Sequence, residues 1–239
     1  MLLLKIVNPF GIAIMNLETL LKTQSTGAIQ ILDSKIPLSA YCKIDLSTTN
    51  ETLKGIDITS PDLCQQYIDD ILGLNNAKVA FGGYLEKRAL YAKSERFLEA
   101  GQRNIHLGMD FWCKAGTKVI VPLEGKVHSF KNNDDVGNYG PTILLEHQIG
   151  DVTFYTLYGH LSLESIHEIE IGAYFDRGEV LGTLGTPDIN VNYAPHLHFQ
   201  VILDLEGYYG DYPGVSSWNN LDFYKKNCPN PNSLLRMDF

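Results

Sequence analysis

The stretch APHLHFQV, residues 194–201, places two histidines one residue apart inside an apolar run. In a β-strand alternate side chains point to the same face, so His196, His198 and Gln200 would share one face. The two imidazoles would stand about 6–7 Å apart at the backbone, a spacing that suits one small site. An isolated pair of this kind is more often two half-exposed histidines on a solvent face, so other segments must decide between the two interpretations.

Two earlier segments supply further groups of the same chemistry. NIHLGMDFW, residues 104–112, carries His106 and Asp110, and YTLYGHLS, residues 155–162, ends a strand-like run with His160. A straight strand would hold His106 and Asp110 about 13 Å apart, too far for one ion, but Gly108 permits a bend between them. Imidazole and carboxylate are good ligands for zinc.

Five candidate side chains exceed what a metal site needs. A catalytic zinc ion usually has three protein ligands and one open position. The surplus imidazoles would suit proton transfer near neutral pH. The residues therefore indicate three ligands and two catalytic histidines, without showing which histidine of the His196/His198 pair binds metal.

The middle of the chain has the rhythm of antiparallel sheet. Short strand-like runs alternate with turns rich in Gly, Pro and Asn, which predicts a mainly β fold built as a sandwich or partly open barrel. The runs are KVIVP (118–122), KVHSF (126–130), TILLEH (142–147), VTFYTLYGHL (152–161), EVLGTLG (179–185) and HLHFQVIL (196–203). We expect His147 to end its strand, where it could support the site by hydrogen bonding.

The sequence predicts three parts. Residues 1–100 form an N-terminal α/β accessory region with a helix near residues 61–74, because Ser60, Pro61 and Asp62 make a typical helix start. Residues 101–205 form the catalytic domain, and residues 206–239 form a C-terminal loop and tail.

Composition limits partners and compartment. The net charge is −9 and no cluster of Lys and Arg appears, which argues against a nucleic-acid partner. The four scattered cysteines fit free thiols in a reducing compartment. The apolar start is too short to span a membrane and lacks a secretory leader, so we expect a cytoplasmic protein that starts at Met1 or Met15, with export by an unrecognised route as the alternative. The oligomeric state is left open.

The motifs HLGMD, TLYGHLS and PHLHFQ, in this order, resemble those of the lysostaphin/LytM-type zinc metallopeptidases. The resemblance covers roughly residues 104–203. It implies an antiparallel β barrel-sandwich of the duplicated hybrid motif kind, with the metal in an open groove. It implies that His106, Asp110 and His198 bind Zn²⁺, that His160 and His196 are the catalytic pair, and that the substrate is a peptide. In this family the hydrolysed bonds are glycyl or D-amino-acid bonds of peptidoglycan or its fragments.

Two alternatives remain at this point. The chain could be a non-catalytic module of the same fold that binds a peptide or a protein. It could also be a metal-dependent oxygenase of the cupin type, but residues 200–204 offer no Glu and no histidine follows His198, which disfavours that class. The stretch TPDINVNYA, residues 186–194, departs from the Gly- and Ser-rich stretch of many relatives and leaves the substrate open.

Overall fold

The computed structural model describes residues 17–90, 103–135, 137–190 and 193–237. The two alternative starts, Met1 and Met15, lie outside the described residues. Within these ranges no helix has both the length and the apolar character needed to cross a membrane.

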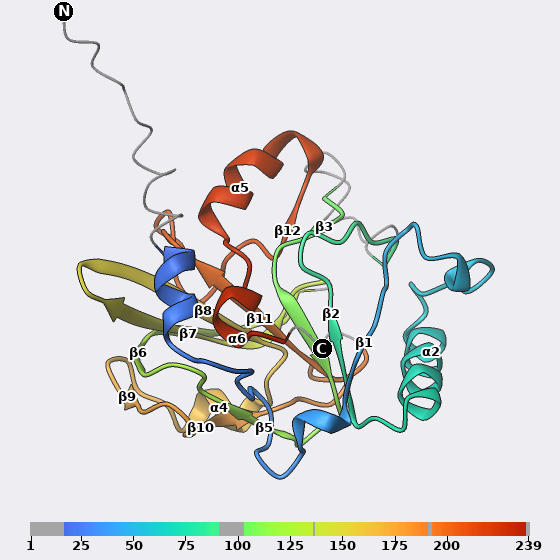
Figure 1. The fold of residues 1–239 in the computed structure, drawn as a ribbon, viewed down its shortest axis with the longest axis horizontal. Coiled ribbons are helices and arrows are strands. Elements are labelled where there is room, and N and C mark those ends of the chain that lie inside the picture. Colours follow the sequence, from blue (N-terminus) through green and yellow to red (C-terminus); the bar gives the residue numbers. More distant parts are fainter. Residues whose placement is uncertain (1–16, 91–102, 136, 191–192, 238–239) are drawn as a thin grey trace, which may run out of the picture.

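An open eight-stranded sheet crosses the molecule (Figure 1). All neighbouring strands in it are antiparallel except β1 and β2, which pair in parallel. In spatial order the strands are β1 (Tyr41–Lys43), β2 (Val79–Gly82), β4 (Met109–Trp112), β11 (His196–Ile202), β8 (Val152–Gly159), β7 (Gly140–Ile149), β6 (Gly125–Asn133) and β9 (Tyr174–Phe175).

Smaller elements surround this sheet. Two short antiparallel pairs accompany it, namely β10 (Val180–Thr183) with β5 (Lys118–Ile120) and β12 (Val215–Ser216) with β3 (Ile105–His106). The helices are α2 (Pro61–Leu74), α4 (Leu163–His167), α5 (Leu221–Asn227) and α6 (Asn232–Leu235), and residues 17–23 are also helical. Short 3₁₀ turns lie at η1 (Leu38–Ala40), η2 (Glu51–Leu53) and η3 (Trp218–Asn220).

Strand β11 is the centre of the fold, because it pairs with β4 on one side and β8 on the other. Its alternate residues Leu197, Phe199 and Val201 are fully buried in the main hydrophobic core. Its opposite face is buried as well, because Ile202 packs in a second cluster with Leu205, Tyr212 and other residues that follow the strand. The predicted alternation is therefore present, but the histidine face is covered by protein.

The N-terminal region joins the same sheet. Strands β1 and β2 extend the sheet beyond β4, and α2 packs beside them by burying Cys64, Tyr67 and Ile68. The helix predicted near residues 61–74 is α2, with Pro61 as its first residue. The division of the chain at residues 100 and 205 stays a prediction, and the predicted C-terminal loop and tail contains the helices α5 and α6.

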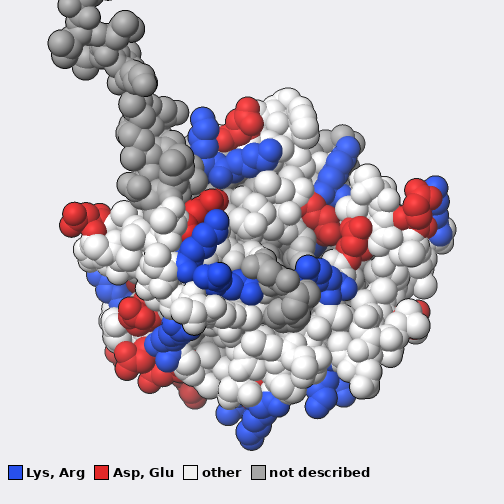
Figure 2. All heavy atoms as spheres, viewed as in Figure 1, with Lys and Arg blue, Asp and Glu red and all other residues white. Residues whose placement is uncertain are grey.

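The mainly β fold class is confirmed. The described strands form an open mixed sheet with two small accessory pairs, and no closed barrel is found among them. The sheet is open because β1 and β2 extend it beyond β4, so that β1 at one edge and β9 at the other do not pair (Figure 1). On the face shown in Figure 2, positive and negative side chains are interspersed and separated by uncharged surface.

The interpretation of His147 as a support for the site is wrong. His147 lies within β7, and its Nδ1 donates a hydrogen bond to the Glu124 carbonyl oxygen at 2.8 Å. Its Nε2 lies 2.6 Å from the Thr156 hydroxyl, and its ring stacks on Phe154. The side chain therefore belongs to the core of the sheet. Burial lowers the pKa of His147 to about 4.

We predict that His147 makes the protein sensitive to acid. Its folded-state pKa lies below the unfolded value of about 6.5, so the unfolded chain binds a proton first as the pH falls from 6.5 towards 4. Between pH 7 and pH 4.5 this costs about 2 kcal/mol of stability. His147→Gln, which keeps a donor and an acceptor, should lose correspondingly less stability over that range in denaturant titrations. Equal losses in the two proteins would contradict the prediction.

Candidate metal centre

The sheet brings the candidate residues together through its register. His198 on β11 lies opposite Asp110 on β4 and opposite Gly159 on β8, the residue before His160. His106 ends β3, which pairs with β12 at Val215. Three segments that are distant in sequence therefore meet at one end of the central strands.

Gly108 lies between β3 and β4, where the sequence predicted a bend. A glycine is required there for a reason other than backbone flexibility. Its φ is not in the left-handed region. A Cβ atom at this position would lie 2.7 Å from Cε1 of His198 and 2.7 Å from the Phe199 carbonyl oxygen. The glycine is needed because the backbone passes directly against His198.

Three potential ligand atoms converge. His106 Nε2 lies 2.8 Å from His198 Nδ1 and 3.2 Å from Asp110 Oδ1, and His198 Nδ1 lies 3.1 Å from the same carboxylate oxygen. Among the described residues, these three form the group of His, Cys, Asp or Glu side chains with the spacing to hold a metal ion.

The other nitrogen of each ring fixes its tautomer. His106 Nδ1 donates to the Gly83 carbonyl oxygen at 2.9 Å. The Gln200 amide nitrogen donates to the Pro213 carbonyl oxygen, so the Gln200 amide oxygen faces His198 and accepts from its Nε2 at 2.9 Å. Both rings therefore direct a lone pair at the carboxylate oxygen, and metal-binding histidines are typically oriented in this way.

The pKa values of His106 and Asp110 disfavour a proton bound between these ligand atoms at neutral pH. Burial, followed by the positive charge of Arg88, lowers the pKa of His106 to about 4. Burial alone would raise the pKa of Asp110, but His106 and Arg88 together hold it well below its ordinary value. The neutral His106 ring and the ionised Asp110 carboxylate at neutral pH, together with the His198 Nδ1 lone pair directed at the same oxygen, form a set of three acceptors that a cation can bind.

His160 and His196 form a second pair beside this centre. Their ring centroids lie 4.1 Å apart, and His196 also stacks on Trp112. His160 has a left-handed φ of 63°. Its amide donates to the Tyr139 carbonyl oxygen and its carbonyl oxygen accepts from the Gly185 amide, and both bonds hold this backbone conformation.

The ring nitrogens of the two histidines differ in their partners. His160 Nδ1 is buried with no hydrogen-bond partner among the described residues. His196 Nδ1 donates to the Ala194 carbonyl oxygen at 2.7 Å, which leaves Nε2 with the lone pair.

Both histidines of this pair are neutral near pH 7. Burial, followed by the neighbouring imidazoles of His196 and His198, holds the pKa of His160 well below its ordinary value. Burial also lowers the pKa of His196. Two neutral imidazoles can each accept a proton, so the arrangement suits acid–base chemistry next to a cation.

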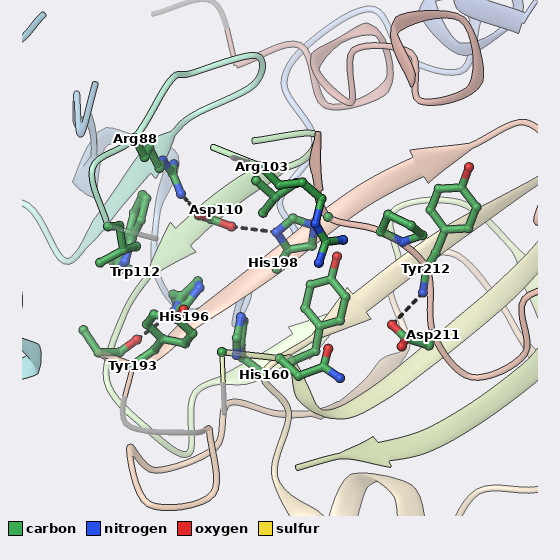
Figure 3. Close-up of a pocket in the computed structure, with 18 of the residues that line it drawn as sticks. Arg88, Arg103, Asp110, Trp112, His160, Tyr193, His196, His198, Asp211 and Tyr212 are labelled. Atoms are coloured by element: carbon green, nitrogen blue, oxygen red, sulfur yellow. Dashed lines mark hydrogen bonds and ion pairs between the residues drawn. The ribbon is translucent and has the colours of Figure 1, made fainter. Parts of the chain in front are cut away.

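A cavity of about 140 Å³ opens over both groups (Figure 3). Asp110 and His198 line it with His160 and His196, and aromatic side chains such as Tyr193 and Tyr212 form further parts of the wall. Four of the five predicted site residues thus face one space, whereas His106 contacts His198 and Asp110 without lining the cavity.

Sequence reasoning missed several residues of the site. Arg88, Gly83 and Tyr139 contact the predicted residues, and Arg103 lines the cavity. Arg88 follows Glu86 and Lys87, and such mixed charge is typical of a solvated surface, so no local signal distinguished it.

One family model and several solved structures are similar to this chain. The model of peptidase family M23 matches residues 104–208. The catalytic domain of the antimicrobial peptidase lysostaphin from Staphylococcus simulans is 22% identical, with 64% of this chain and 96% of that chain covered and a TM-score of 0.38. A variant catalytic domain of the prophage-encoded M23 protein EnpA from Enterococcus faecalis is 17% identical, with 55% and 85% covered and a TM-score of 0.38.

The chain spans 43% of a peptidase M23 protein from Pseudomonas aeruginosa, at 22% identity over 54% of this chain with a TM-score of 0.36. No functionally curated protein was found to be similar to the chain. The family model covers all three sequence motifs together with the five candidate side chains. Residues 104–208 therefore match peptidase family M23, in agreement with the lysostaphin/LytM-type motifs of the sequence, and this matched segment is named the M23 domain.

Proposed function

We propose that this protein is a zinc-dependent metalloendopeptidase that hydrolyses glycyl or D-amino-acid peptide bonds of peptidoglycan or its fragments. One observation supports this more than any other: three buried acceptor atoms converge, with two neutral imidazoles beside them. His106 Nε2, His198 Nδ1 and Asp110 Oδ1 lie 2.8–3.2 Å from one another.

The donor set fits zinc. Zinc prefers nitrogen and oxygen ligands at about 2.0–2.2 Å in a tetrahedron, whose edges are then about 3.3 Å long. The three observed separations of 2.8, 3.1 and 3.2 Å are close to such edges. Three protein ligands leave a fourth position open, as in catalytic rather than structural sites.

The residues of the chain would divide the work. When bound, a zinc ion supplies Lewis-acid chemistry, because it polarises a carbonyl group and makes water more acidic near neutral pH. His196 Nε2 carries a lone pair and can accept a proton from water, since Nδ1 is held by Ala194. His160 Nδ1, which has no partner among the described residues, can bind a polar group of the substrate, or it can accept a proton released by the water and pass that proton on to the leaving amine.

The substrate class is inferred from the family resemblance. The cavity has an apolar aromatic wall together with the two arginines Arg88 and Arg103, and a peptide offers both apolar and carbonyl groups. The cytoplasmic location expected from the sequence would favour wall fragments or other small peptides over an intact wall. The alternative of a peptide-binding module without catalysis predicts binding that persists after chelation.

We predict that zinc content depends on His106. Purified protein should contain about one zinc ion per chain by elemental analysis, and a chelator should abolish cleavage of glycine oligomers and of D-amino-acid peptides. His106→Ala should lose metal and activity together, whereas the exposed His167→Ala should keep both. Cleavage that continues in the chelated protein would refute the proposed function.

We predict that His160 acts in turnover and not in metal binding. His160→Ala should keep the zinc content of the parent and lose about 10²–10⁴-fold in kcat, because a group that moves protons is removed. If the variant cleaved an accepted substrate as fast as the parent, the role of His160 would be wrong.

We predict that Gly108 is required for the position of His198. In Gly108→Ala the new methyl group would meet Cε1 and Nε2 of His198 at 2.7 and 2.8 Å, so the ring must move. Zinc affinity, measured by competition with a chelator, should fall by about tenfold or more. The matched control is Gly73→Ala in α2, where a Cβ meets nothing within 4 Å, and it should bind zinc like the parent. Equal affinities for both variants would exclude this effect.

A further inference from the structure

A segment outside the M23 domain contacts the metal-binding side chains. Residues 85–88 run antiparallel to residues 104–106, with the Leu85 amide donating to the His106 carbonyl oxygen and the His106 amide donating to the Glu86 carbonyl oxygen, at 2.8 and 2.9 Å. The family match begins at residue 104. The strand that carries His106 is therefore held in place by residues that precede the domain.

Gly83 and Arg88 in this region contact the potential ligands directly. The Gly83 carbonyl oxygen accepts the Nδ1 proton of His106. The Arg88 guanidinium donates through Nη1 to Asp110 Oδ2 at 2.5 Å, whereas Oδ1 of the same carboxylate faces His198 (Figure 3). His106 Nε2 also lies 3.2 Å from this Oδ1 atom. The two carboxylate oxygens of Asp110 thus have different partners.

Arg88 is itself held from several sides. Its side chain is buried, its Nε donates to Glu86 Oε2 at 2.5 Å, and its guanidinium lies 5.4 Å from the ring centre of Trp112. Glu86 in turn accepts a hydrogen bond from the Leu46 amide through Oε1. The planar guanidinium is thereby fixed in orientation, which a flexible surface arginine would not be.

We propose that Arg88 is a positioning residue that restricts Asp110 to a single metal-binding oxygen. This inference rests on the proposed metal-dependent function. A free carboxylate can offer two oxygens to a metal ion, and a second oxygen would occupy the position that a catalytic site keeps open. Because Arg88 engages Oδ2, Asp110 can offer Oδ1 alone. The N-terminal region would in this way set the coordination number of a site whose ligands all belong to the M23 domain.

Two effects of Arg88 oppose each other, and this makes the proposal testable. As a nearby positive charge, Arg88 disfavours a cation, so its removal would tighten metal binding if charge were its main effect. As a positioning residue, it favours binding, so its removal would weaken affinity and change the coordination geometry.

The experiment replaces the native metal with Co²⁺, whose visible absorption is strong in a four-coordinate site and weak in a site of higher coordination. The proteins are the full-length parent, Arg88→Met, Arg88→Lys and the control Lys87→Met, which removes an exposed positive charge from the neighbouring position. Circular dichroism checks folding, and chelator competition measures Co²⁺ affinity. Should Arg88→Met fail to fold, Arg88→Lys alone decides the question.

We expect the parent and Lys87→Met to show strong absorption and equal affinity. Arg88→Met should show weaker absorption and about tenfold lower affinity, and Arg88→Lys should lie between them, because an ammonium group can hold one oxygen but lacks the planar fork. Parent-like spectra in both Arg88 variants, with unchanged or tighter binding, would overturn the proposal. A parent that binds neither Co²⁺ nor Zn²⁺ would instead overturn the proposed function, and this inference with it.

Discussion

The convergence of three acceptor atoms at the end of the central strands is the constraint on which the rest of the site depends. His106 Nε2, His198 Nδ1 and Asp110 Oδ1 lie within hydrogen-bond distance of one another, and the two rings are fixed by other partners so that their lone pairs face inward. Acceptors at such distances repel unless a positive charge lies among them. Burial of all three side chains removes the water that would otherwise weaken this repulsion.

The scaffold maintains this arrangement through β11. Hydrogen bonds to β4 and β8 on its two sides leave the strand little freedom to shift, and a shift of one residue would turn His198 to the opposite face. The apolar face of β11 is anchored by Leu197 and Phe199 in the main core. The histidine face is closed by the segment that follows, where Pro213 and Cys228 hold Gln200 and thereby the ring of His198. Packing on both faces therefore contributes to the orientation of one imidazole.

Much of the fold could be predicted from local patterns. The alternation in β11 and the start of α2 at Pro61 are visible in a few neighbouring residues, because strand and helix periods and helix-start preferences are local properties. Burial of the histidine face and the joining of β1 and β2 to the sheet were not predictable, since both depend on contacts between distant segments. The role of His147 was misjudged for the same reason: its partner Glu124 precedes β6 and its partner Thr156 lies in β8.

Arg88 shows why residues that orient a candidate ligand are harder to predict from sequence than the candidate ligands themselves. Ligands are recognised by residue type and spacing, whereas an arginine that orients a ligand has the same local sequence as one in solvent. Burying the charges of Glu86, Arg88 and Asp110 together carries a large desolvation cost, and well-packed apolar residues at such positions are often at least as stabilising. Stability therefore does not explain the network by itself. The proposed role of Arg88, by which Asp110 presents one defined oxygen, would explain the network. It would also account for the contact between the N-terminal region and a site whose candidate ligands lie in the M23 domain.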